Sequence, residues 1–444
     1  MQLTDDDFVL VALSDAQDQG QPASLQSDYL AEVTRAVEEA AEGLWTVNKA
    51  IHDNPELGYH EFKAHRVLTD YMQQQGGWTV TRSAYGLATA WTAVYDSGRP
   101  GPAVSFNAEY DALEGIGNAC GHNLIATASL AGGLATAEVM KRHDLSGKVV
   151  IFGTPAEEGG GGKIKLLEAG AYRDQKVDIN LISHPGIVVD SAIMRTAAYT
   201  AFRVEYFGRE AHAAASPWLG INALDALITA YSALSVLRQQ TMPGDVIQGN
   251  ITHGGVRPNI IHAYAAGDFV VRADTRARLE ELKRKVDACF EAGALAAGAR
   301  LKMTTSMSYA DHVPNRVLAH SYRRHFNSLE PPVQIPDDDE VDDMRGKTNA
   351  SSDQGDISYA MPSLNAGFSI PAGPEGNGPH SPDFADAAGT RVAFERALRT
   401  GKALAGTALD VLVTKGLLEE VKKAWADDMR RASQASSVIL PVEA

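Results

Sequence analysis

A cysteine and a histidine stand two residues apart in the segment Asn118-Ala-Cys120-Gly-His122-Asn123. A thiolate and an imidazole with a glycine between them can reach one metal ion from a tight turn. Either residue by itself is more often a buried small side chain or a hydrogen-bonded polar residue. The additional glycines at 115 and 117 favour a tight turn, and therefore a metal site at Cys120 and His122.

Two adjacent carboxylates form the second candidate, in the segment Gly153-Thr-Pro-Ala-Glu157-Glu158-Gly-Gly-Gly-Gly162. Neighbouring carboxylates repel each other, so a solvated turn is one interpretation of this segment. In the other interpretation, one carboxylate binds a metal ion and its neighbour takes a proton from water. The four glycines then serve as backbone that passes close to the site.

Two histidines complete the set, His184 in Ser183-His-Pro-Gly186 and His380 in Gly378-Pro-His-Ser-Pro382. Each of them alone is typical of a plain loop histidine. Together the four segments supply five metal-binding side chains: Cys120, His122, Glu158, His184 and His380. Five ligands exceed the three that a single catalytic zinc takes, and they suit two metal ions about 3.5–4 Å apart.

Polar residues of a later region indicate substrate contacts. His212 lies in a small-residue turn, and Asn259 and His262 precede Arg272, which stands in an expected strand. An arginine in such a strand is usually a surface salt-bridge partner. In the alternative, its guanidinium holds a substrate carboxylate through two hydrogen bonds.

Alternating strands and helices must position these residues. Short β-prone runs and helical segments alternate in the first half of the chain, with strands at 90–95, 103–108, 149–153 and 177–183 and helices at 126–143 and 162–169. This order predicts βαβ units and a largely parallel sheet whose carboxyl edge carries the polar residues. The region 196–305 follows a different order, β-α-β-β-α, which predicts a small inserted α+β sandwich.

We therefore predict an α/β fold with two parts. The catalytic domain has a mixed, largely parallel sheet flanked by helices, and the inserted domain is a ferredoxin-like α+β sandwich. The expected boundaries are 27–195 and 306–420 for the catalytic domain and 196–305 for the inserted domain, with terminal extensions at 1–26 and 421–444.

Composition narrows the function classes. The 444 residues include 40 Lys+Arg and 56 Asp+Glu, a formal net charge of −16, which disfavours nucleic acid and anionic membranes as partners. No apolar stretch approaches the length of a membrane-spanning helix, and the acidic N-terminus is unlike a signal peptide. Two cysteines, Cys120 and Cys289, cannot form a disulfide framework, so we expect a cytoplasmic protein.

In their order along the chain, these segments resemble the aminoacylase/carboxypeptidase family of co-catalytic metallopeptidases. The similarity is greatest to the amidohydrolase branch, which includes bacterial hippurate-type hydrolases and animal β-alanyl-lysine dipeptidase. Three further segments carry it: Glu109-Tyr-Asp-Ala-Leu, Gly-Lys-Ile-Lys-Leu after the four glycines, and Pro217-Trp-Leu-Gly-Ile-Asn-Ala-Leu-Asp225. The resemblance extends from Asn48 to Ala405, nearly the whole chain.

The resemblance implies a role for each candidate. It makes Cys120, His122, Glu158, His184 and His380 the metal ligands, Glu157 the general base, and Asn259 and Arg272 the residues that hold the substrate carboxylate. His212 would reach the active site of the partner in a homodimer and polarise the scissile carbonyl. Other branches begin with a His-x-Asp ligand motif, where this chain has Glu109-Tyr110-Asp111. Asp111 would then orient a ligand while Cys120 supplies the missing one.

We therefore expect a dinuclear, metal-dependent amidohydrolase or dipeptidase that acts as a homodimer through residues 196–305. Its two divalent ions would be zinc by ligand type, with manganese or cobalt as alternatives. Its substrates would be dipeptides or N-acyl amino acids with a free carboxylate. Two alternatives stay open: amide-bond formation by the same site in a biosynthetic pathway, and a metal-binding protein whose site has lost its activity.

Overall fold

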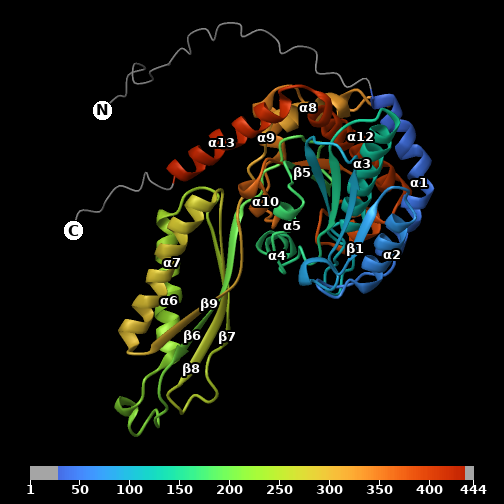
Figure 1. Ribbon diagram of the computed structural model, residues 1–444. Helices are drawn as coiled ribbons and strands as arrows, with labels where there is room; N and C mark the ends of the chain where they lie inside the picture. The colour runs from blue at the N-terminus through green and yellow to red at the C-terminus, as the bar shows by residue number, and fades with distance from the viewer. Residues whose placement is uncertain (1–28, 436–444) are drawn as a thin grey trace, which may run out of the picture.

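The computed structural model describes residues 29–435, which form two parts, each built on one β-sheet (Figure 1). An elongated part around a four-stranded sheet projects from a larger part around a six-stranded sheet. The predicted lead-in at 1–26 and residues 436–444 of the predicted C-terminal extension lie outside the described residues. Within 29–435, no helix has both the length and the apolar character that crossing a membrane requires.

The six-stranded sheet is mixed and largely parallel. In sheet order its strands are β1 (Thr79–Arg82), β2 (Trp91–Asp96), β4 (Lys148–Gly153), β3 (Ala103–Ala108), β5 (Ile179–Gly186) and β10 (Ser363–Ser369). Strands β4, β3, β5 and β10 pair in parallel, whereas β1 and β2 form an antiparallel edge. The predicted fold of the larger part is confirmed.

Helices cover both faces of this sheet (Figure 1). One face packs against α1 (Leu30–His52), α2 (Phe62–Gln73), α3 (His122–Arg142), α8 (Arg316–Asn327) and α12 (Arg391–Val413), and the other against α4 (Gly162–Glu168), α5 (Ala171–Asp174) and α10 (Gln354–Ala360). In β4, Val149 and Ile151 face the first core, while Val150 and Phe152 face the second. Because both faces are buried, this strand is a continuous apolar run.

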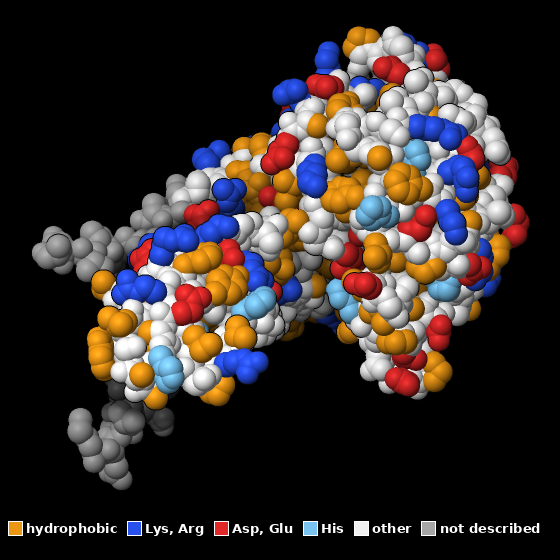
Figure 2. Space-filling view, turned by 90° about the horizontal axis from the view of Figure 1, so that it is seen from below, with side chains coloured by type: hydrophobic (Ala, Val, Ile, Leu, Met, Phe, Trp, Pro, Cys, Tyr) orange, Lys and Arg blue, Asp and Glu red, His pale blue; other side chains and the backbone are white. Residues whose placement is uncertain are grey.

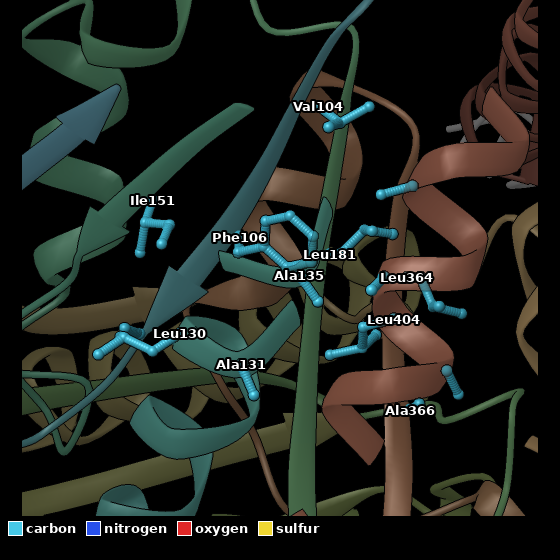
Figure 3. Close-up of a cluster of buried hydrophobic side chains, with 14 of the residues drawn as sticks. Val104, Phe106, Leu130, Ala131, Ala135, Ile151, Leu181, Leu364, Ala366 and Leu404 are labelled. Carbon is cyan, nitrogen blue, oxygen red and sulfur yellow. The ribbon is translucent and has the colours of Figure 1, made fainter. Parts of the chain in front are cut away.

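The main core lies between the sheet and helices α3 and α12 (Figure 3). Figure 3 shows Phe106 of β3 and Leu181 of β5 together with Leu404 of α12. The two helices approach closely at Gly401 of α12, because this residue has no side chain. A Cβ there would lie only 2.7 Å from the Cβ of Ala131 in α3. This dense packing gives the strand ends a rigid base.

The four-stranded antiparallel sheet has the order β7-β8-β6-β9. Its elements are β6 (Ala198–Phe207), α6 (Ala223–Leu237), β7 (Val246–His253), β8 (Tyr264–Ala273), α7 (Arg276–Ala297) and β9 (Arg300–Tyr309). Strand β9 was not expected, because its Thr- and Ser-rich sequence lacks an apolar run. With β9 the order becomes β-α-β-β-α-β, so the predicted ferredoxin-like sandwich is confirmed. We call this part the insert.

Three more helices belong to the larger part: α9 (Asp339–Gly346), α11 (Pro382–Ala388) and α13 (Leu417–Ala435). Helix α9 begins after Asp338, whose side chain accepts hydrogen bonds from the backbone N–H groups of Glu340 and Val341 in its first turn. Helix α13 occupies much of the expected C-terminal extension, and its residues Leu417 and Val421 are buried in the main core. The domain boundaries themselves stay a prediction.

Candidate metal centre and active site

The residues expected at the metal centre follow the carboxyl ends of the parallel strands. Glu109 comes directly after β3, Glu157 and Glu158 follow β4, and His184 belongs to β5. His380 lies in the loop between β10 and α11. Because these strand ends meet at one edge of the sheet, residues far apart in the sequence come together there.

The turn between Cys120 and His122 depends on its glycine. Gly121 has a φ of 77°, and a Cβ at this position would lie 2.6 Å from Cγ of Pro185. A side chain there would be both strained and in collision. The turn ends where α3 begins, at His122, so the helix start sets the direction of that imidazole.

Asp111 connects this turn to the carboxylate pair. Its Oδ1 lies 3.0 Å from Nδ1 of His122, and its Oδ2 accepts a hydrogen bond of 2.9 Å from the backbone N–H of Glu158. With Nδ1 donating to Asp111, Nε2 of His122 is left as a lone-pair acceptor. This is the geometry that the predicted orienting role of Asp111 requires.

The structure brings the five predicted ligands into two groups that share one atom. The first group is Cys120, His122 and His184, the second is Cys120, Glu158 and His380, and within each group the candidate ligand atoms lie within 4.8 Å of one another. The Sγ of Cys120 lies 3.4 Å from Nε2 of His184, and Nε2 of His380 lies 3.2 Å from Oε1 of Glu158.

Three buried acceptor atoms at this point fit a bound cation. Nε2 of His122 and Oε2 of Glu109 have no hydrogen-bond partner among the described residues, and Oε1 of Glu158 has only the contact of 3.2 Å with Nε2 of His380. Nε2 of His122 lies 3.5 Å from Glu109, 3.8 Å from Glu157 and 3.9 Å from Glu158. Buried acceptors without donors are costly unless a cation is present, so the donor set fits divalent metal ions.

The two adjacent carboxylates differ in their acidity. Burial and the neighbouring charge of Glu109 raise the pKa of Glu157 well above its ordinary value. Burial also acts to raise the pKa of Glu158, but the contact with His380 and the charge of His122 outweigh it and lower this pKa to about 2. Glu158 therefore stays ionised, as a metal ligand must, whereas Glu157 holds a proton more readily.

Side chains from distant segments hold the loop that carries these carboxylates. Oε1 of Glu61 accepts from the N–H of Ala156 at 2.8 Å, the Tyr59 hydroxyl donates to the carbonyl of Gly160 at 2.5 Å, and the Tyr309 hydroxyl donates to the carbonyl of Glu157 at 2.9 Å. These three side chains were not predicted from the sequence, since none of them stands in a motif.

A buried lysine lies behind the metal centre. Nζ of Lys163 is 2.6 Å from Oε1 of Glu109 and 2.5 Å from Oδ1 of Asp353, and its side chain has no exposed surface. Burial acts to lower the pKa of Lys163, but the charges of Asp353 and Glu109 raise it well above its usual value. This ion group was not predicted from the sequence either, although Lys163 directly follows the four glycines.

A cavity of about 860 Å³ lies between the insert and the larger part, and Figure 2 shows the molecule hollowed there. Its lining includes Cys120, Glu157, Glu158, His184 and His380 from one side, and Arg272 of β8 from the insert. Nη1 of Arg272 donates to Oγ of Ser351 at 2.8 Å, and the guanidinium lies 4.6 Å from the ring centre of Tyr199. No carboxylate of the described residues forms an ion pair with Arg272.

His212 and Asn259 are not brought to this cavity. They lie together, since the N–H of Ala213 donates to the carbonyl of Asn259 at 3.1 Å and His212 forms a β-bridge with Ile260. Both residues are exposed and absent from the cavity lining. They follow β6 and β7 at the end of the insert that points away from the six-stranded sheet (Figure 1).

Known proteins with similar sequence or fold support this description. Residues 103–383 match peptidase family M20/M25/M40. The Xaa-Arg dipeptidase of Mus musculus is 38% identical over 398 residues, which cover 87% of this chain and 90% of that protein. One of the chains of p-aminobenzoyl-glutamate hydrolase from Escherichia coli is 29% identical over 63% of this chain and 62% of its own length.

The fold is also that of a dinuclear metal-binding peptidase of the M20 family from Bacillus subtilis, with a TM-score of 0.61 at 17% identity, covering 86% of this chain and 99% of that one. The family match covers more than half of the chain, and it includes the turn, the carboxylate pair and both later histidines. The chain therefore belongs to peptidase family M20/M25/M40 and is a metal-dependent hydrolase of peptide bonds.

Proposed function

We propose that this protein is a dinuclear metal-dependent dipeptidase or amidohydrolase, whose substrates are dipeptides or N-acyl amino acids with a free carboxylate. One observation carries the proposal: two groups of candidate ligands share the Cys120 thiol, and Glu157 stands beside both of them. Two metal ions would use all five candidate ligands, and Glu157 would be left free for proton transfer.

Cys120, His122 and His184 would hold one metal ion, and Cys120, Glu158 and His380 would hold the other. Thiolate, imidazole and carboxylate donors together suit zinc, with manganese or cobalt as alternatives. When bound, such ions activate water and polarise the amide carbonyl. This is the hydrolytic chemistry that the family carries out.

Glu157 moves the proton. Its carboxylate accepts the proton that the attacking water loses, and then donates it to the leaving amide nitrogen. Glu157 is only 6% exposed, which limits the contact of its carboxylate with bulk water. Asp111 holds the ring of His122 in one orientation through the contact at Nδ1.

Arg272 binds the carboxylate of the substrate. Its guanidinium lines the same cavity as Glu157 and has no carboxylate partner among the described residues. The names of two relatives, Xaa-Arg dipeptidase and p-aminobenzoyl-glutamate hydrolase, both describe an amide bond to an amino acid with a free carboxylate. Dipeptides that end in arginine are therefore the first substrates to test.

The active form is a homodimer in which His212 and Asn259 of one subunit serve the cavity of the other. Large apolar side chains near these residues are exposed: Trp218 by 76%, Leu219 by 57% and Val256 by 90%. Hydrophobic side chains on the surface of the insert are visible in Figure 2. Strand β7 is an open edge of its sheet, and such an edge can pair with a second chain. Sedimentation of an active monomer would contradict this arrangement.

The test combines metal analysis with a substrate screen. Protein loaded with zinc or manganese is incubated with Xaa-Arg dipeptides and N-acyl amino acids, and products are identified by mass spectrometry. We expect two ions per subunit, and cleavage that a chelator abolishes. If protein with two bound ions cleaved none of these compounds, the proposed function would be wrong.

Substitutions of the two cysteines test whether Cys120 contributes to the binding of both metal ions, with Cys289 as the control. Cys120→Ser should lower the content of both metal ions, because both groups include Cys120. Cys289→Ser, in the insert, should leave two ions bound. Both cysteines are free in the structure, so each can be replaced without breaking a disulfide.

A further inference from the structure

Three residues of the insert form a continuous row across its sheet, at the end that adjoins the metal centre. Tyr199 of β6 is paired with Arg272 of β8 on one side and with Tyr309 of β9 on the other. All three line the cavity that contains Glu157. The row therefore begins at the proposed carboxylate-binding residue and ends beside the proposed general base.

The members of this row are in contact. The Arg272 guanidinium lies 4.6 Å from the ring centre of Tyr199, and the rings of Tyr199 and Tyr309 are 5.9 Å apart. The Tyr309 hydroxyl donates to the carbonyl of Glu157 at 2.9 Å and accepts from the N–H of Gly161 at 3.1 Å. Tyr309 is 4% exposed, so its ring has little freedom to move by itself.

The loop that carries Glu157 depends on such external contacts. Gly159 and Gly161 have φ values of 88° and 64°, and glycines offer no side chains through which a loop can be packed. Tyr59 and Glu61 hold the loop from the larger part, whereas Tyr309 holds it from the insert. A movement of the end of the insert sheet therefore acts on the backbone of Glu157 through Tyr309.

We propose that Tyr309 is a positioning residue, which couples the binding of a substrate carboxylate at Arg272 to the placement of Glu157. The inference rests on the proposed hydrolytic function. A carboxylate bound by Arg272 fixes that residue, Tyr199 and Tyr309 in one arrangement, and this reduces the freedom of the Glu157 backbone. Substrates without the carboxylate then bind weakly and also meet a poorly placed base.

The kinetic test removes one hydroxyl group. For L-alanyl-L-arginine, Tyr309→Phe should lower kcat about tenfold or more, since misplacement by about 1 Å costs up to ~10²-fold. KM should change by less than about twofold, because Arg272 remains in place. Tyr206→Phe is the matched control: the buried Tyr206 hydroxyl donates to the backbone carbonyl of Phe290 at 2.7 Å inside the insert and does not line the cavity, so kcat of this variant should stay near wild type. Tyr199→Leu, which removes the ring, should behave like Tyr309→Phe.

A second readout does not use catalysis. Hydrogen exchange of the peptide 157–162 is measured with L-arginine and with L-argininamide, which lacks the carboxylate. In the metal-loaded wild type, L-arginine should slow this exchange more than L-argininamide does. The difference should disappear in Tyr309→Phe and persist in Tyr206→Phe.

The outcomes separate this inference from the proposed function. If the wild type cleaves dipeptides, and Tyr309→Phe has wild-type kcat and a wild-type exchange difference, Tyr309 has no positioning role and the hydrolase stands. If the wild type with two bound ions cleaves nothing but shows the Tyr309-dependent exchange difference, the coupling stands and the proposed function falls. A Tyr309→Phe protein that loses thermal stability alone, with the exchange difference intact, also contradicts the inference.

Discussion

The larger part and the insert differ in whether their predicted site residues lie together at the cavity. In the larger part, five candidate ligands from four separate segments meet within a few ångströms. Of the three predicted site residues of the insert, Arg272 reaches the cavity, while His212 and Asn259 lie exposed at the far end of the insert. One chain therefore brings together all five candidate metal ligands but only one of the three predicted site residues of the insert.

Replacement of Glu157, the proposed base, should have the largest effect on kcat. It tests whether the larger part supplies both the metal ligands and the base. Glu157→Gln should lower kcat by about 10²–10⁴-fold, because the proton of the attacking water loses its acceptor. Both metal ions should remain bound, as measured by mass spectrometry of the metals. Glu158→Gln is the control, in which metal content falls together with activity. Near wild-type hydrolysis by Glu157→Gln would show that another group is the base.

Loss of the buried Lys163 ammonium group should lower the free energy of unfolding of the protein. Lys163→Met leaves Glu109 and Asp353 without their partner, and breaking a buried ion pair costs about 3–5 kcal/mol of unfolding free energy. Denaturant titration measures this loss. Burial raises the pKa of Asp353 to about 6, so the deficit should be smaller at about pH 5, where the carboxylate takes up a proton, than at about pH 8.

The matched variant for Lys163 is on the same helix. Lys165 is exposed and lies 3.9 Å from the ring centre of Tyr59, a contact worth about 0.5–1 kcal/mol. Lys165→Met should therefore cost much less stability than Lys163→Met. Equal losses would mean that the ion group behind the metal centre contributes nothing specific.

His212 tests whether the insert completes a neighbouring site. His212→Ala should lower kcat by about 10²–10³-fold, the usual effect of removing a group that stabilises the developing oxyanion. A mixture of His212→Ala and Glu157→Gln subunits should recover part of the activity, because one site of a mixed dimer then has both residues. His320→Ala, an exposed histidine on α8 of the larger part, is the control. Failure of the mixture, with exchange of subunits demonstrated, would exclude action across the dimer.

Arg272 should give the smallest and most selective effect. Arg272→Met should lower kcat/KM by about 10–100-fold for substrates with a free carboxylate, because a charge-assisted bidentate contact is lost. Amidated substrates should be cleaved equally by the variant and the wild type. Arg203→Met, which removes a surface arginine paired with Asp268 at 3.0 Å, should change neither rate.

Much of the fold could be predicted from local patterns. The strands β3, β4 and β5 are apolar runs followed by polar residues, and this pattern reflects burial on both faces. Strand β9 was missed because one face of the insert sheet is open, so Arg300–Tyr309 has no need of a strong apolar pattern. Helix α13 extends where a terminal extension was expected, and its burial of Leu417 and Val421 depends on contacts with distant elements.

The order and chemical types of Cys120, His122, Glu158, His184 and His380 are properties of the sequence, and they were sufficient to predict a metal-dependent hydrolase. The contacts of Lys163 and Tyr309 depend on tertiary structure alone, since each joins segments more than a hundred residues apart. The exposed position of His212 likewise depends on tertiary structure, since this residue follows strand β6 and lies outside the cavity lining. Local sequence patterns indicate which side chains can bind metal ions or transfer protons. The distances between these side chains depend on how elements from distant parts of the chain pack together.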